Sequence, residues 1–357
     1  MQEETNSQNP FKQLGLIGAG FSLLIGVIIL FIFVSKLTNS YSMPGVGESP
    51  SLDNSSKVGD FIGGVVGVFF SLAGVFLLVL TFAEQRNAFK KERFEARYFE
   101  LLRIHLSNVA DFEIANTVKG RTCIKYMINE LRIIYRYVEL GAIAHNLLNE
   151  DSKVKSNRDY LSMAFLIMFF GIGYSSERQL SEIFNEDESE IFKSFVKGKL
   201  EEVQKKYAGT PPKYTPKYFE YNIPLNGVPD GYTFETQFYP FDGHSSRLGH
   251  YYRHLYQTVR FVDSQPESIV NPSEKYEYLK SLRATLSNQE QLLLYYNCIS
   301  ILGIEWIEKG LIKKYAFIKN IPLGLVDIGI NPHEIFGRHT QSGKFLFESD
   351  EIKERKL

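Results

Sequence analysis

Two long uncharged runs near the N-terminus constrain the fold of this chain more than any other feature. Residues 14–34 contain no charged side chain over 21 positions, and residues 61–82 contain none over 22. As helices, each would be about 30 Å long, which matches the hydrocarbon core of a bilayer. Helices of soluble proteins seldom stay apolar on every face for this length. The sequence therefore predicts a transmembrane hairpin, with two buried helices of a large soluble core as the alternative.

Small residues recur at four-residue spacing in both runs. One stripe consists of Gly18, Ser22 and Gly26, and the other of Gly63, Gly67 and Ser71. Such stripes let helix backbones approach closely in lipid. They could pair the two spans or join separate subunits, so a homo-oligomer is an open expectation.

The distribution of basic residues predicts the orientation of the hairpin. The link at 35–60 has only two, whereas five follow the second run, namely Arg86, Lys90, Lys91, Arg93 and Arg97. This excess places both termini in the cytoplasm. The expected segments are a cytoplasmic N-terminus (1–13), transmembrane helices (14–34 and 61–82), an extracytoplasmic loop (35–60), a helical cytoplasmic domain (83–330) and a C-terminal tail (331–357).

The part after the second run is predicted to be mainly helical and to lie in a reducing compartment. Cys123 and Cys298 are far apart and fall in helix-like segments, as buried thiols do. The formal net charge of −1 gives no general attraction to nucleic acid. The uncharged run at 161–174 is short for a span, so a core helix is favoured over a third membrane segment. From Asn331 onward we expect loose packing.

Residues 243–256, with the sequence GHSSRLGHYYRHLY, concentrate side chains that can bind anions or move protons. In a helix beginning near Ser246, Arg247, His250 and His254 would follow the i, i+3, i+7 spacing of one face. Arg253 and Arg283 are candidate binding partners. The preceding segment, 208–242, has no helical period and a turn signal at 229–231, and long irregular segments of this kind are often functional.

The motif Ser287-Asn288-Gln289-Glu290 fits a helix capping box. Ser287 is the expected N-cap, and the Glu290 side chain is expected to fold back onto its backbone. This gives Glu290 a structural task that needs no catalysis. The helix that it opens is expected to run to Gly303, and one more short helix is expected at 304–315.

Several motifs in order carry a family resemblance. They follow the two glycine-bearing runs and are FELLRIH at 99–105, GR at 120–121, RLGHYYRHLY at 247–256 and LRATLSNQEQLLLYYN at 282–297. From the first run to about residue 315 the chain resembles the putative phage abortive infection protein family of bacteria. The resemblance implies a multi-pass protein of the bacterial inner membrane that acts in anti-phage defence. It implies no settled chemistry and no cofactor.

The residues leave several mechanisms open. Arg247 and His254 resemble the Arg-x4–6-His spacing of HEPN-type ribonucleases, in which arginine would hold the scissile phosphate and histidine would act as acid or base. Leu248 departs from that family, which usually has a polar residue there, and only this alternative implies a nucleic-acid partner. A metal site formed by His250 and His254, with His244 as a third ligand, is less favoured, since no HExxH motif is present.

Two further alternatives need no catalysis. In the first, the helical domain senses a phage-derived trigger and drives rearrangement of the hairpin in the lipid bilayer, so that the membrane leaks or depolarises. In the second, the chain is a structural membrane protein, and the cluster at 243–256 only fixes the core of its domain by hydrogen bonds.

Overall fold

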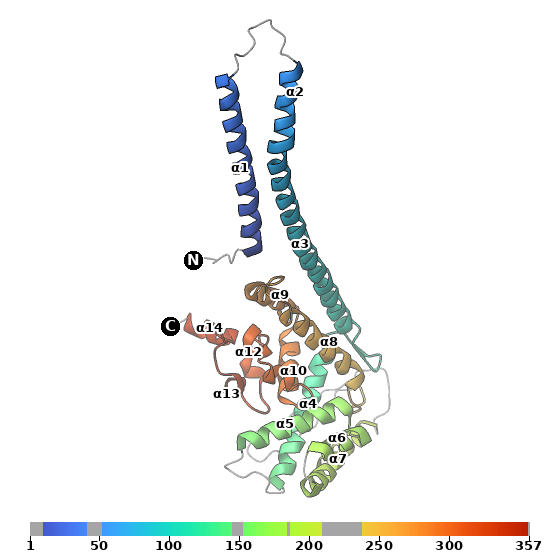
Figure 1. Cartoon of the computed structure of the whole chain (residues 1–357). Coiled ribbons are helices and arrows are strands. Elements are labelled where there is room, and N and C mark those ends of the chain that lie inside the picture. Colours follow the sequence, from blue (N-terminus) through green and yellow to red (C-terminus); the bar gives the residue numbers. More distant parts are fainter. Residues whose placement is uncertain (1–9, 41–51, 145–152, 184–185, 209–237, 356–357) are drawn as a thin grey trace. The chain divides into compact units, whose positions relative to one another are not determined.

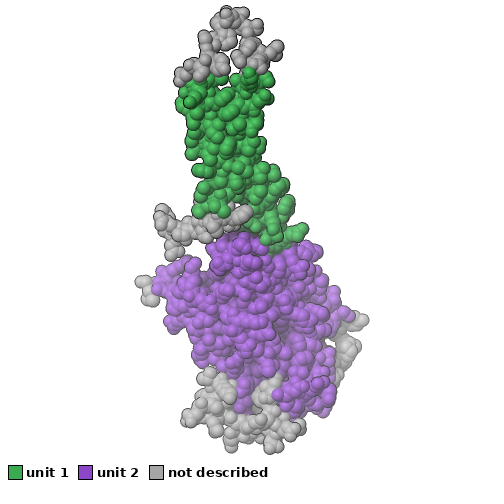
Figure 2. Space-filling model, in the orientation of Figure 1, with its two compact units in different colours: residues 1–95 green, residues 96–357 purple. Residues whose placement is uncertain are grey.

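The computed structural model describes residues 10–40, 52–144, 153–183, 186–208 and 238–355. The chain divides into two compact units, residues 1–95 and 96–357 (Figure 2). Among the described residues, helices dominate and the only paired strands form one short antiparallel hairpin (Figure 1). The predicted fold class, with two long apolar helices followed by a helical domain, is confirmed. The second unit begins at residue 96.

The first unit is built on two long helical segments. They are α1 (Pro10–Ser40) and the succession of α2 (Leu52–Phe61), a π-helical turn η1 (Ile62–Val66) and α3 (Gly67–Ala110), of which α3 extends into the second unit. Both segments are long and apolar enough to cross a membrane. Both segments are longer than the uncharged runs. Residues 35–40 and 52–60 of the expected loop at 35–60 are therefore helical. No proline interrupts either extension, so nothing forces the helices to stop earlier.

The apolar side chains of this unit point largely outward, while one glycine stripe faces inward. Leu14 is 69% exposed and Phe31 is 74% exposed. On α1, an added Cβ at Gly18 would lie 3.3 Å from the ring of Phe76, so the first stripe packs inside the hairpin. An added Cβ at Gly63 would meet nothing within 4 Å, so this position of the second stripe makes no such packing.

The second unit starts with the last part of α3 and folds as a bundle. After α3 come the strands β1 (Glu113–Ile114) and β2 (Val118–Lys119). The longer helices are α4 (Thr122–Ala144), α5 (Lys153–Phe170), α6 (Tyr174–Ile183), α7 (Glu186–Ala208), α8 (Ser245–Asp263), α9 (Pro272–Ala284) and α10 (Asn288–Ile299). The short ones are α11 (Glu305–Glu308), α12 (Leu311–Tyr315), η3 (Leu323–Leu325), α13 (Pro332–Phe336) and α14 (Glu348–Glu354).

Helices α5 and α10 form much of the core of this unit. Every residue from 290 to 299 is buried, and so is every residue from 160 to 168. The run at 161–174 is therefore a core helix, as the sequence favoured. It ends at Phe170 because Gly171 has a φ of +82°, a backbone conformation that suits glycine.

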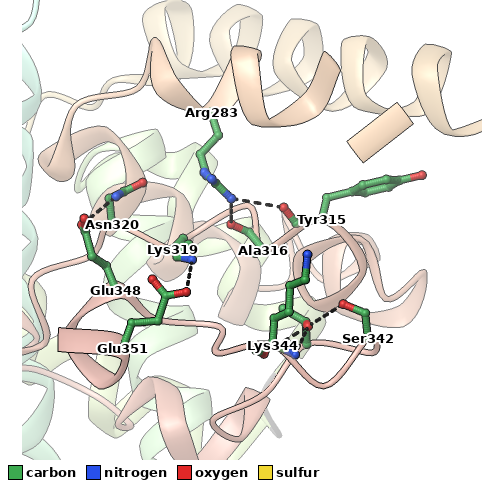
Figure 3. A network of polar contacts seen from close by, with 10 residues as sticks. Arg283, Tyr315, Ala316, Lys319, Asn320, Ser342, Lys344, Glu348 and Glu351 are labelled. Atoms are coloured by element: carbon green, nitrogen blue, oxygen red, sulfur yellow. Dashed lines mark hydrogen bonds and ion pairs between the residues drawn. The ribbon is translucent and has the colours of Figure 1, made fainter. Parts of the chain in front are cut away.

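The C-terminal tail contradicts the expectation of loose packing. Leu346 and Phe347 are fully buried, and the ring of Phe347 packs edge-on against that of His333, with 5.0 Å between the centroids. Polar contacts hold the tail to the preceding segment (Figure 3). Lys319 Nζ donates to Glu351 Oε1 at 2.8 Å, and Asn320 Nδ2 donates to Glu348 Oε2 at 2.8 Å.

Other boundaries differ from the expected ones. The single helix expected at 304–315 is broken into α11 and α12 at Gly310, whose φ is +64°. Helices α6 and α7 lie on either side of residues 184–185, which the structure does not describe. The irregular segment at 208–242 and its turn at 229–231 fall largely outside the described residues.

Candidate functional site around helix α8

Helix α8 enters the domain at a crossing of two glycines. Gly243, just before the helix, has a φ of +90°, and an added Cβ would lie 2.6 Å from the backbone carbon of Phe170. Gly171 faces it, and a Cβ there would lie 2.8 Å from backbone atoms of Asp242. The backbone N–H of His244 also donates to Phe169 O at 2.9 Å. Only glycine allows the two backbones to approach this closely, so the crossing fixes where α8 begins.

A buried pair of side chains anchors the same segment. His244 Nε2 lies 2.6 Å from Glu130 Oε2 on α4, and the two side chains are 2% and 0% exposed. Glu130 Oε1 also accepts the backbone N–H of Phe241. A buried carboxylate with two such partners is satisfied, and removing either partner would leave an uncompensated polar group. The pair therefore ties the start of α8 to α4.

Arg247 is engaged with the small hairpin. Its Nε donates to the backbone oxygen of Glu113 at 2.5 Å. Glu113 opens β1, whose pairing with β2 includes the Glu113–Lys119 register. The guanidinium thus links the first turn of α8 to the segment that joins α3 and α4. A phosphate ligand of Arg247 would have to compete with this hydrogen bond.

A stacked pair of histidines lies between α3 and α8. The rings of His105 and His254 have centroids 6.4 Å apart and are nearly parallel, at 16°. His105 is completely buried, and all four ring nitrogens of the pair are buried without a hydrogen-bond partner among the described residues. Burial lowers the pKa of His105 to about 4, and the nearby His254 and Arg121 act in the same direction. Burial also lowers the pKa of His254. Both rings are thus neutral at pH 7.

Arg121, Tyr251 and Glu290 form a further contact of this region. The predicted capping box is confirmed, because Ser287 Oγ accepts the Glu290 N–H at 3.2 Å and Glu290 Oε2 accepts the Ser287 N–H at 2.8 Å. The same carboxylate lies 3.4 Å from Arg121 Nε and accepts from Tyr251 Oη at 3.4 Å. Arg121 Nη2 also donates to Thr285 O at 2.6 Å.

The structure brings together only some of the residues that the sequence singled out. Arg247 and His254 both contact the α3–β1 region, whereas His250 and Arg253 are exposed on α8. Arg283 lies elsewhere, since its Nη1 donates to Tyr315 O at 3.4 Å and Ala316 O at 2.8 Å, at the end of α12 (Figure 3).

The sequence reasoning missed the two partners that give the site its character. His105 and Arg121 were noted only as parts of the motifs at 99–105 and 120–121. Both face α8 from earlier helices or loops, and no local spacing relates them to it. In the part of the chain that the structure describes, no three His, Cys, Asp or Glu side chains gather to hold a metal ion. Both cysteines are buried and free, as predicted.

The geometry of this region suits a contact between His105 and His254 that depends on protonation, and it does not suit acid–base catalysis. A general acid or base must reach its substrate within hydrogen-bonding distance. The ring nitrogens of His254 are instead enclosed against His105, and Arg247 is bound to a backbone oxygen. The exposed residues of α8 that can carry a charge are His250 and Arg253, whereas Ser245, Ser246 and Gln257 are exposed but neutral.

Comparison with known proteins locates a family likeness in this same region. No curated protein and no solved structure gives a match to the chain. A family model described as "Putative phage abortive infection protein" matches residues 243–325. The match begins at the glycine before α8 and covers α9, α10, α11 and α12. The part of the chain that carries the candidate site is thus similar to the phage abortive infection family that the sequence motifs indicated.

Proposed function

We propose that this chain is a membrane-anchored phage-defence protein. Its second unit responds to infection and acts on the membrane through the apolar helices of the first unit. The main support for anchoring is the outward-facing apolar surface of α1 and α3, because exposing so long an apolar surface to water is energetically unfavourable. The match to the abortive infection family supports the defence role.

The contacts of α8 with α3 support a mechanical output. Within the second unit, Tyr98 and His105 of α3 are buried. The ring of His105 stacks with that of His254 on α8 and makes a tilted contact with that of Tyr251. Helix α3 is unbroken from Gly67 to Ala110, so the residues that α8 contacts share one helix with the second apolar run. A shift of α8 is therefore transmitted directly to the helix that enters the membrane.

The exposed residues of α8 are the natural place for a trigger to bind. His250 and Arg253 are three positions apart, both face solvent, and neither has an ion-pair partner among the described residues. We assign them the recognition of a phage-derived trigger. No charged side chain lies within the uncharged runs, so a pore would require several copies of the chain.

The ribonuclease alternative is less well supported. It assigns phosphate binding to Arg247 and acid–base catalysis to His254, but these side chains are engaged or enclosed as described above. A purely structural role leaves the exposed basic face of α8 without a task. We therefore favour the membrane effector.

A topology experiment tests the anchoring. A reporter that is active only outside the cytoplasm is expected to be active when fused after Asn54 and silent when fused after Leu357, because the basic residues after the second run stay in the cytoplasm. The full-length chain is expected to resist extraction from membranes at high pH. Recovery in the wash, or an active reporter at Leu357, would overturn the proposal.

A further inference from the structure

Helix α3 carries a basic and aromatic face directly after its apolar run. Phe82, Arg86, Phe89, Lys90 and Arg93 recur at steps of three and four residues or lie beside one another, so they share one side of the helix. Together with Gln85 they line a single shallow hollow on the surface of the first unit. Phe82 is 59% exposed and Phe89 is 62% exposed, although both are large apolar side chains.

The charge of this face is not neutralised by the protein. Arg86, Lys90 and Arg93 have no ion-pair partner among the described residues. The nearest acidic residue that precedes them, Glu84, lies on the other side of α3 and is paired with Lys12 of α1 at 2.5 Å. The face therefore offers three uncompensated cations flanked by exposed aromatic rings.

We propose that this face of α3 binds the headgroups of anionic phospholipids, with Phe82 and Phe89 inserted at the boundary of the hydrocarbon. Basic clusters next to a membrane helix attract anionic lipid surfaces, and aromatic side chains favour the interface. The inference rests on the proposed membrane anchoring, but it adds a specific lipid class and specific residues. It gives these residues a binding role beyond their effect on orientation.

The test uses the full-length protein reconstituted in vesicles with equal amounts of phosphatidylcholine and phosphatidylglycerol. The association of each spin-labelled lipid with the protein is measured by electron paramagnetic resonance. The wild-type protein is expected to prefer phosphatidylglycerol. Replacing Arg86, Lys90 and Arg93 by Gln is expected to reduce this preference several-fold, since each basic side chain near an anionic surface favours binding by roughly fivefold at low salt.

The matched control removes three exposed lysines of the second unit, Lys125, Lys205 and Lys353, also by substitution with Gln. It has the same change in net charge and should keep the wild-type preference. High salt should weaken the preference in the wild type, because it screens exposed charges. An equal association of the two lipids with the wild-type protein, or an unchanged preference in the triple variant, overturns the inference.

A second measurement leaves the charges intact, since removing them could also alter orientation. In a Phe89→Trp variant, fluorescence should be quenched more by brominated phosphatidylglycerol than by brominated phosphatidylcholine. The native Trp306 is 2% exposed and is not expected to respond. Equal quenching by both lipids refutes the lipid site alone, because the protein is then still in the membrane. A protein that is washed from the membrane refutes the anchoring proposal as well.

Discussion

Substitution of Gly243 by Ala is expected to destabilise the helical unit strongly. The new Cβ would lie 2.6 Å from Phe170 C and 2.7 Å from Gly171 N, which are backbone atoms that cannot rotate away. The φ of +90° adds strain for any residue with a side chain. Strain and overpacking each cost about 1–3 kcal/mol, so the free energy of unfolding should fall by about 2–6 kcal/mol. This is a large share of the stability of a typical domain.

Gly249→Ala is the matched control on the same helix. Its Cβ would lie 3.7 Å from the ring of Phe169, an ordinary contact, and the residue is inside α8. Alanine favours a helix over glycine by about 0.5–1 kcal/mol, so this variant should be as stable as the wild type or more stable. Denaturant unfolding of the detergent-solubilised chain, followed by circular dichroism, measures both. Equal midpoints for the two variants would contradict the close crossing at residues 171 and 243.

Acidification is expected to destabilise the contact between α3 and α8 through His105. The pKa of this residue is about 4 in the folded protein, whereas the ordinary value is 6.5. Between these values the unfolded chain binds a proton that the folded chain does not, so stability falls as the pH falls from 6.5 toward 4. Below pH 4 the loss is complete. A shift of this size corresponds to roughly 3 kcal/mol.

The measurement compares wild type and His105→Leu in unfolding experiments from pH 7 to pH 4. Leucine has no proton to bind and no unpartnered ring nitrogen, so the variant should lose about 3 kcal/mol less than the wild type over this range. Gly249→Ala serves as the control, because it lies on α8 and replaces no titratable group, so its pH dependence should follow the wild type. Parallel curves for wild type and His105→Leu would show that His105 is not the responsible group.

The fold was largely predictable because its strongest signals are local. Uncharged runs, the spacing of apolar residues and the capping box at Ser287 depend on neighbours in sequence, and each indicated a helix that the structure contains. The tail was misjudged for the opposite reason. The burial of Leu346 and Phe347 depends on distant partners, and their segment is too short to show a period.

The candidate site was predictable only on helix α8 itself. The sequence placed Arg247, His250 and His254 on one helix but could not show that His250 faces solvent while His254 is enclosed. The partners Glu130, His105 and Arg121 come from α4, α3 and the turn before α4. Such pairs across the fold leave no spacing pattern in a single sequence.

The proposal that the chain acts on the membrane is tested most directly in infected cells, by following membrane potential and bulk RNA integrity in the same culture. Cells that carry the protein are expected to depolarise early while their RNA remains intact. The variants His254→Gln and Arg247→Lys separate the alternatives further, since they keep much of the side-chain volume but remove proton transfer and bidentate phosphate binding. Depolarisation by variants that accumulate normally would agree with the membrane effector. The membrane effector would be contradicted if RNA were cleaved in cells that keep their membrane potential, and if this cleavage were lost in the two variants.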